Sequence, residues 1–442
     1  MIDEKRKEVL HRKWNLKIYL IYILRGFRGM AFSRKKRIVS VLFTILLTVI
    51  TSVILFNKPN YASVFVNLNS LAENLRVFFV VVIAMFVLLL YIYLLGKPCG
   101  AKQMNDDFKR AGMVNHTGEA PLLLSKNSLP ENKRVKVYEF YTAGIPFSLW
   151  QDRLGELESA LNLKISHFEE GRNSRTIKMY AVSGNDTLPR KIDWQNKYLI
   201  KGERGFSLAL GESIAGEKVS VNLRAVPHIL IGGSTGSGKS LLLKLLLYQS
   251  VKKGASVIIA DFKGGVDFSR IWHEKCVIIT EKGELKKALT DIVNELEKRK
   301  AILRTSGCTN IDEFNQQAEN KLIRTIIACD EAGELLDKTG LSKDDKAEVA
   351  AIENLLSTIA RQGRAFGIHL ILSTQRPDSN ILSGQIKSNI DYRVCGRADL
   401  VLSQIILDKG DAHDRIAKNA QGRFINNDDI LFQAYWFDER NW

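Results

Sequence analysis

Two long apolar runs in the first hundred residues predict membrane-spanning helices. The run 38–56, IVSVLFTILLTVITSVILF, has no charged residue in nineteen positions, and 77–96, VFFVVVIAMFVLLLYIYLLG, has none in twenty. Each is long enough to cross about 30 Å of hydrocarbon as a helix. Basic residues flank both runs, which disfavours the alternative of two buried core helices. We therefore expect two transmembrane helices with a short external loop over 38–96.

Basic residues on both sides of this hairpin predict its orientation. Residues 1–37 hold twelve Lys or Arg against three acidic residues, which gives +9 of the chain's net +16. The intervening segment 57–76 has three charged residues, and four basic residues follow between 97 and 110. Positive flanks stay on the cytoplasmic side. We expect a multi-pass protein of the cell membrane, with a basic cytoplasmic leader over 1–37 and both termini in the cytoplasm.

Part of the leader is itself apolar. The stretch 14–27, WNLKIYLIYILRGF, is too short to span a bilayer. It predicts either a helix lying along the inner leaflet or a short cytoplasmic helix.

After the hairpin, the pattern predicts a linker and two domains. Residues 97–132 are polar, with Gly, Pro, Asn and Lys, as in a linker. In 133–215 the segments RVKVYEFYTAG, SLWQDRLGELESALNL and TIKMYAVSG predict strand, helix and strand of a small α/β domain. From 216 to 442, apolar strands such as HILIGG, SVIIAD, TIIACD and HLILST alternate with helical segments. That alternation is typical of a parallel central sheet covered on both faces.

Composition adds two limits. The five cysteines are scattered without a CxxC pair, so neither a disulfide framework nor a zinc site is indicated. Removing the +9 of the leader from the total leaves only +7 on the other 405 residues. A nucleic-acid surface in that part is permitted by the charge but not required by it.

The sequence GSTGSGKS follows the first strand of the larger domain and precedes an apolar helical segment. It fits the pattern G-x-x-x-x-G-K-[ST] of a phosphate-binding loop, so we expect ATP and Mg²⁺ as ligands. Its glycines allow backbone N–H groups to face phosphate oxygens, and the following helix presents its positive end. Lys239 is expected to reach the β- and γ-phosphates, and the Ser240 hydroxyl to bind Mg²⁺. The predicted binding residues are Gly233, Ser234, Thr235, Gly236, Ser237, Gly238, Lys239 and Ser240.

Polar residues that follow two other strands complete the predicted site. Asp330 ends the strand TIIAC and is expected to hold Mg²⁺ together with Ser240. Glu331 is expected to polarise the attacking water, so the pair predicts hydrolysis, against the alternative of a solvated helix start. Gln375 follows HLILST, and we expect it at the same sheet edge, where an amide can sense the γ-phosphate or the water. A capping glutamine in a turn is its alternative.

Several motifs in order resemble the FtsK/SpoIIIE family of membrane-anchored, hexameric DNA translocases. Over 205–425 they are LGESIAGEKVSVNL, PHILIGGSTGSGKS, DFKGGVDFS, NELEKRKAIL, CDEAGEL, GIHLILSTQRP, IKSNIDYRV, SQIILDKGDA and GRFI. The resemblance implies a RecA-like ring that hydrolyses ATP between subunits and drives DNA, with largely non-specific contacts, through a channel. It implies Arg364 as a trans-acting arginine finger, with Arg393 as second candidate and an interface ion pair as alternative. It also implies that Asp261 and Lys263 line the nucleotide.

The chain departs from the chromosome-partitioning members, which carry four membrane spans and a C-terminal winged helix. Here two spans are predicted and seventeen residues follow GRFI, so we expect no sequence-reading domain. In this the chain resembles the coupling proteins of Gram-positive conjugative plasmids and integrative elements. That resemblance implies a relaxase and channel proteins as partners. A chromosome-partitioning translocase, a type VII-like protein secretion ATPase and a scaffold with an inactive nucleotide site are the alternatives.

Overall fold

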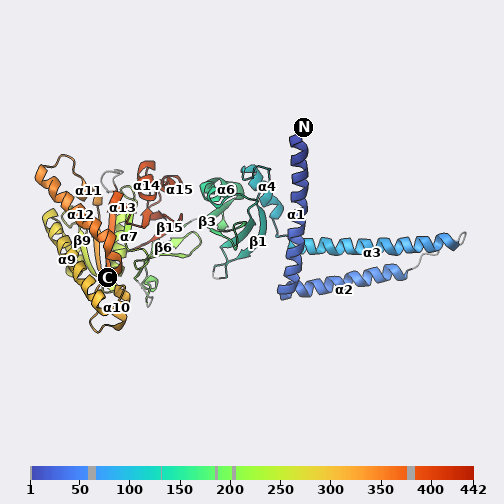
Figure 1. The fold of residues 1–442 in the computed structure, drawn as a ribbon, viewed down its shortest axis with the longest axis horizontal. Helices are drawn as coiled ribbons and strands as arrows, with labels where there is room; N and C mark the ends of the chain where they lie inside the picture. The colour runs from blue at the N-terminus through green and yellow to red at the C-terminus, as the bar shows by residue number, and fades with distance from the viewer. Residues whose placement is uncertain (1, 58–65, 131, 185–187, 202–205, 376–383) are drawn as a thin grey trace. The chain divides into compact units, whose positions relative to one another are not determined.

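The chain forms two compact units, Met1–Asn185 and Asp186–Trp442, shown as a ribbon in Figure 1. The computed structural model describes residues 2–57, 66–130, 132–184, 188–201, 206–375 and 384–442. The sequence pattern predicted a domain boundary at 215/216, thirty residues after the division between the units. The difference arises because β6 (Ser207–Ser213) pairs with β15 (Leu431–Trp436), a strand of the second unit.

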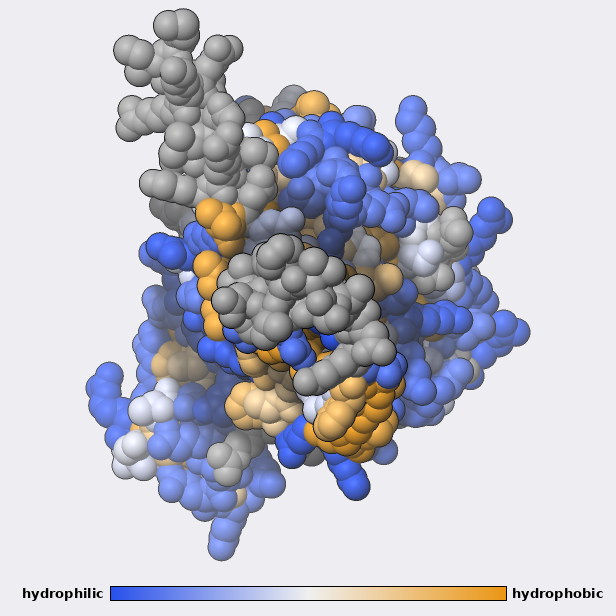
Figure 2. All heavy atoms as spheres, turned by 90° about the vertical axis from the view of Figure 1, so that its right-hand side faces the viewer, coloured by the Kyte–Doolittle hydropathy of each residue, from blue (hydrophilic) through white to orange (hydrophobic). Residues whose placement is uncertain are grey.

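The first unit begins with three long helices, α1 (Ile2–Phe32), α2 (Arg34–Phe56) and α3 (Val66–Gly96). Helix α2 and the part of α3 from Ala72 are long and apolar enough to cross a membrane, with mean hydropathies of 2.7 and 3.0. Only 6% of each apolar window is buried, unlike the core helix of a soluble protein. Their exposed hydrophobic side chains are visible end-on in Figure 2. The predicted loop between the spans falls largely on 58–65, outside the described residues.

Helix α1 crosses α3 with the two backbones in direct contact. A Cβ added at Gly96 would lie 1.9 Å from the Tyr22 carbonyl oxygen, and one at Gly26 would lie 2.1 Å from the Ile92 carbonyl oxygen. Only glycine fits at such a crossing. The Tyr22 hydroxyl also donates to the Leu123 carbonyl oxygen at 3.1 Å, which ties α1 to the small sheet of the same unit.

The remainder of the first unit is a four-stranded antiparallel sheet in the order β1-β2-β4-β3, with short helices. Its elements are α4 (Ala101–Arg110), β1 (Leu122–Ser128), β2 (Lys136–Tyr141), α5 (Phe147–Asp152), α6 (Leu154–Leu161), β3 (Leu163–Glu170) and β4 (Thr176–Ser183). The linker predicted for 97–132 is therefore wrong over α4 and β1. Apolar residues of this segment belong to the core of the unit: Phe108, for example, packs edge-on against Phe140 and Trp150.

The second unit is built on one large mixed sheet in the order β10-β9-β11-β12-β8-β13-β14-β15-β6-β7. Its parallel part consists of β8 (Ile229–Gly232), β9 (Ser256–Ala260), β10 (Val277–Ile279), β11 (Thr325–Cys329), β12 (Ile368–Thr374) and β13 (Tyr392–Cys395). Its antiparallel part consists of β14 (Arg423–Asn426), β15, β6 and β7 (Lys218–Asn222), and the short β5 (Ile192–Asp193) pairs with β15. The parallel central sheet predicted from the sequence is confirmed.

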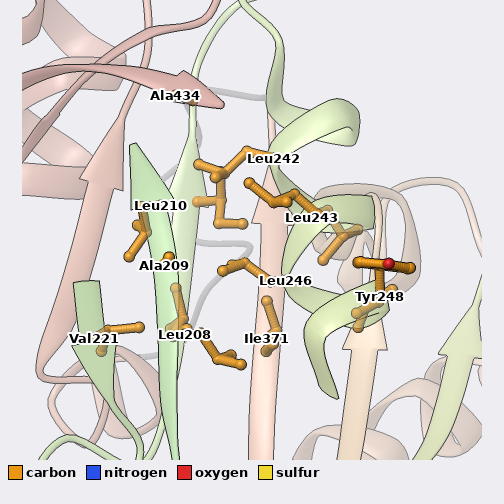
Figure 3. Close-up of a cluster of buried hydrophobic side chains, with 14 of the residues drawn as sticks. Leu208, Ala209, Leu210, Val221, Leu242, Leu243, Leu246, Tyr248, Ile371 and Ala434 are labelled. Atoms are coloured by element: carbon orange, nitrogen blue, oxygen red, sulfur yellow. The ribbon is translucent and has the colours of Figure 1, made fainter. Parts of the chain in front are cut away.

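Helices cover both faces of the parallel strands. Alternate residues of β8 enter different cores: Ile229 and Ile231 pack with α7 (Lys239–Lys252), and Leu230 joins the core that contains α9 and α12. Figure 3 shows the first of these cores, with leucines of α7 between β6 and Ile371 of β12. The other helices are α8 (Arg270–Lys275), α9 (Lys282–Ser306), α10 (Ile311–Gln317), α11 (Ala332–Leu336), α12 (Lys343–Phe366), α13 (Gly384–Lys387), α14 (Leu400–Leu407) and α15 (Asp411–Arg415); the short 3₁₀ turns are Asn196–Tyr198 and Glu439–Asn441.

The strand order explains how distant residues reach one edge. Strand β12 lies between β8 and β11 and is parallel to both, with Thr374 level with Gly232 and Leu372 level with Cys329. The carboxyl ends of parallel strands point to the same edge of the sheet. The segments after β8, β11 and β12 therefore meet there.

Candidate active site

The loop after β8 has the backbone conformation of a phosphate-binding loop. Gly233, Gly236 and Gly238 all have positive φ, at 146°, 74° and 103°. A Cβ at Gly238 would also lie 3.1 Å from the Gly422 backbone, so a side chain there would be tightly packed as well as conformationally strained. Gly238 is the N-cap of α7, and no side chain caps that helix. Its first N–H groups are thus left for an anion.

Lys239 begins α7 inside the site. Its side chain is buried, with a relative exposure of 7% for the residue. Burial lowers the pKa of the Lys239 ammonium, and the nearby carboxylates Glu331 and Asp330 oppose this effect. The carboxylates thus favour the charged form of Lys239, and a buried cation attracts phosphate oxygens strongly because water screens it little.

Asp330, at the end of β11, lies beside the Ser240 hydroxyl, which donates to Asp330 Oδ2 at 3.4 Å. Lys263 Nζ is also 3.4 Å from Asp330 Oδ2. Within the described part of the chain, the buried Asp330 Oδ1 and Asp261 Oδ2 have no hydrogen-bond partner. Unpaired carboxylate oxygens next to a hydroxyl form a donor set that suits Mg²⁺. Among the residues that the structure describes, no group of three or more His, Cys, Asp or Glu side chains is arranged to hold a metal ion.

Burial shifts the pKa values of the groups around Asp330. Burial raises the pKa of Asp261, which the backbone N–H of Lys263 partly offsets. For Lys263, burial acts to lower the pKa, but Asp330 and Asp267 outweigh it and raise the pKa. Lys263 therefore stays a cation. Asp261 and Lys263, which the family resemblance implies as residues that line the nucleotide, both follow the end of β9 at this edge of the sheet.

Glu331 and Gln375 are held together at the same edge. The Gln375 backbone N–H donates to both Glu331 carboxylate oxygens at 3.2 Å, and the Thr374 hydroxyl donates to Glu331 Oε1 at 3.0 Å. The Thr235 hydroxyl donates to Gln375 Oε1 at 2.9 Å, so the glutamine side chain contacts the phosphate loop. Burial raises the pKa of the Glu331 carboxyl, and these hydrogen bonds partly counteract it.

Neither predicted arginine lies at this edge of its own subunit. Arg364 is in the last turn of α12, just before β12 begins, and is thus separated from Gln375 by the length of β12. Arg364 is exposed, and its Nε donates to the Arg224 carbonyl oxygen at 3.2 Å. Arg393 is held more firmly, with an ion pair to Asp408 at 2.6 Å and hydrogen bonds to the carbonyl oxygens of Ile390 and Lys387.

Two residues of the site were not singled out from the sequence. Thr374 holds Glu331, and its position next to Gln375 at the end of an apolar strand was the available signal. Arg397 follows β13 and donates to the carbonyl oxygens of Thr235 at 2.6 Å and Lys418 at 2.5 Å. Its own carbonyl oxygen accepts from the Ser234 N–H at 2.7 Å, so it braces the phosphate loop from the neighbouring strand.

Known proteins resemble this chain in sequence and in structure. The FtsK/SpoIIIE family model matches residues 194–329. The DNA translocase FtsK of Chlorobaculum tepidum is 28% identical over 321 residues, 64% of this chain and 38% of that protein. The DNA translocase SftA of Bacillus subtilis is 33% identical over 222 residues, 48% of this chain and 22% of that protein. The chain therefore spans well under half the length of these curated relatives.

A solved structure matches over more of the chain. The pCW3 conjugation coupling protein TcpA, in its monomer form with ATPγS, is 34% identical. The match covers 77% of this chain and 96% of that one, with a TM-score of 0.57.

A glycine loop after β8, a buried lysine at the start of the next helix and an acidic pair after β11 together define a P-loop ATPase. The family model shows in addition that residues 194–329 belong to a domain of the FtsK/SpoIIIE family.

Proposed function

We propose that this protein is a membrane-anchored, ATP-driven DNA translocase that delivers DNA to a conjugative transfer channel. The observation that carries the proposal is the single sheet edge that gathers Lys239, Asp330, Glu331 and Gln375, in a chain 34% identical to a conjugation coupling protein. The two exposed apolar helices support the membrane anchor. In this proposal both termini and the second unit are cytoplasmic, and copies of the chain form a hexameric ring around DNA.

Each residue has a role that its position supports. Lys239 and the free N–H groups of α7 bind the phosphates of ATP. Ser240 and Asp330 would hold Mg²⁺, which supplies positive charge at the phosphates when bound. The Glu331 carboxylate orients a water and accepts its proton, because two donors fix its position next to the phosphate loop. Gln375 contacts both Glu331 and the phosphate loop, which supports a role for it in sensing whether the γ-phosphate is present.

Arg364 is proposed to act on the site of a neighbouring copy. It is exposed, lacks a carboxylate partner among the described residues and stands at the sheet edge opposite to the ATP site. An arginine supplied from a neighbour stabilises charge on the transferring phosphoryl group. Arg393 is a weaker candidate because its guanidinium is already used within its own subunit.

Mixing two inactive variants tests the role of Arg364. Arg364→Ala and Glu331→Gln proteins should each turn over ATP at least about 100-fold more slowly. Mixed, they should regain part of the activity, because some interfaces then join an intact Glu331 to an intact Arg364. Mixing Arg393→Ala with Glu331→Gln serves as the control, and recovery only in that mixture would move the role to Arg393.

DNA dependence tests the function itself. ATP turnover by the full chain should rise with DNA of unrelated sequences, and the effect should weaken with salt because phosphate contacts dominate. In cells, Lys239→Ala should reduce conjugative transfer to background and leave chromosome segregation intact. A segregation defect with normal transfer would favour the alternative role of a chromosome-partitioning translocase. Turnover that ignores DNA would contradict both roles and leave the type VII-like secretion ATPase.

A further inference from the structure

A pocket of about 430 Å³ opens in the first unit, where α1, the beginning of α2, the end of α3 and β1 meet. Five cations line it and no carboxylate does: Arg25, Arg28, Lys36, Lys97 and Lys126. We call this cluster the basic pocket. Its volume lies within the range of small-molecule sites.

Most of this positive charge is not neutralised. Among the described residues, the side chains of Arg25 and Arg28 form no ion pair or hydrogen bond, and Lys36 Nζ donates only to the Leu95 carbonyl oxygen at 3.1 Å. One carboxylate, Glu139, lies near Arg25 without lining the pocket. Burial lowers the pKa of the Arg25 guanidinium and Arg28 adds to this, against Glu139 and Tyr22. Bringing an anion into the pocket would relieve this mutual repulsion.

The basic pocket lies at the foot of the two apolar helices. Lys36 is in the first turn of α2, and Lys97 directly follows α3. Phe32, which also lines the pocket, is 87% exposed, and Leu95 adds a second apolar group. With α2 and α3 in a bilayer, these cations stand at the level of the phosphates, and the apolar side chains stand beside the acyl chains.

Helix α1 continues this amphipathic surface. It exposes Leu20, Leu24 and Phe27 at 58%, 57% and 49%. It crosses α3 instead of running alongside it, as Figure 1 shows. A helix crossing the foot of a membrane hairpin, with exposed apolar and basic residues, is suited to the headgroup region.

We propose that the basic pocket binds the phosphate-bearing headgroup of an anionic phospholipid. The inference goes beyond DNA translocation and rests only on the proposed membrane anchor. The apolar rim and the position between the feet of the spans favour a lipid over free phosphate, which has no apolar part. A zwitterionic headgroup fits less well, because its positive group would be repelled by the five cations that line the pocket.

The test is binding of single lipids to the full chain in neutral detergent, read by native mass spectrometry. Phosphatidylglycerol should bind at least about tenfold more tightly than phosphatidylcholine, and inorganic phosphate should not displace it. Arg25→Gln/Arg28→Gln should weaken phosphatidylglycerol binding about 30-fold. Arg34→Gln/Lys35→Gln, which removes the same charge from neighbouring residues outside the pocket, should change it less than about threefold. Arg28→Glu, at an exposed position, provides a second variant should the double variant fail to fold.

Three results would overturn the proposal: equal binding of the two lipids, equal losses in the pocket variant and its matched control, or full displacement by inorganic phosphate, which would assign the site to the free anion. Flotation of the same proteins with vesicles reports the membrane anchor separately. A wild-type chain that does not float would refute the anchor, and the detergent measurement would still decide whether the pocket selects an anionic headgroup.

Discussion

The phosphate loop of the second unit and the basic pocket of the first unit both present positive charge to an anion, but they are built differently. The loop gathers eight consecutive residues, fixes them by glycine conformation and buries one lysine, Lys239. The basic pocket gathers long side chains from positions as far apart as Arg25 and Lys126, and most of them are exposed. A buried charge on a fixed backbone can act on a reacting group, whereas exposed flexible cations suit retention of a ligand.

Substitution of Lys239 should have the largest effect, because it should abolish the function of the phosphate loop without affecting the basic pocket. Lys239→Ala should lower ATP turnover at least about 100-fold, because the phosphates lose the buried cation at the start of α7. Its binding of phosphatidylglycerol should stay unchanged. Lys252→Ala, at the exposed other end of α7, is the matched control and should keep normal turnover in a coupled ATPase assay. Normal turnover in Lys239→Ala would contradict the assignment of this loop as the site that acts on ATP.

The backbone of the loop provides the next largest effect. Gly238→Ala places a side chain at a φ of 103° and 3.1 Å from Gly422. We expect a loss of about 1–3 kcal/mol in the unfolding free energy and at least about tenfold in turnover, because the N–H groups move off the phosphates.

Gly100→Ala is the matched control for this prediction. It has a comparable φ of 82°, but nothing lies within 4 Å of its added Cβ. It should cost stability without affecting turnover. Equal losses of turnover in the two variants would mean that backbone strain alone, and not the geometry of the loop, explains the result.

The pH dependence of kcat/KM is the finest of these tests. Burial raises the pKa of Glu331, so the carboxylate should protonate and activity fall at a pH above the usual glutamate range. Burial lowers the pKa of Lys239, so the alkaline limb should begin below the usual lysine range. Thr374→Val removes a donor to the carboxylate and should move the acid limb upward by about one pH unit. An acid limb unmoved in that variant would exclude Glu331 as the group that titrates.

The phosphate site could be predicted from the sequence because its parts are local or follow strand ends. The loop is a contiguous motif, and the meeting of the segments after β8, β11 and β12 follows from a parallel sheet. The hydrogen bond between Thr235 and Gln375 was not predictable, because it depends on β12 lying directly beside β8.

Other features depend on pairing that sequence pattern does not show. The division of the chain at Asn185 follows from β6 joining β15, more than two hundred residues later. Helix α4 was read as part of a linker because Phe108 is isolated among polar neighbours, and strand β1 because only its first three residues, Leu122 to Leu124, are apolar. The basic pocket depends on the crossing of α1 and α3 at Gly26 and Gly96. Glycines in a sequence do not by themselves show which helices cross or at what angle.

Strand β12 has a further consequence. All seven of its residues are buried, with Gln375 directly after one end and Arg364 shortly before the other. A buried strand that is hydrogen-bonded on both sides is rigid, so a displacement of one end is transmitted to the other end. In the proposed ring, β12 of each subunit would connect two neighbouring ATP sites. The order in which the subunits hydrolyse ATP would then depend on coupling through this strand, and turnover should depend cooperatively on ATP concentration.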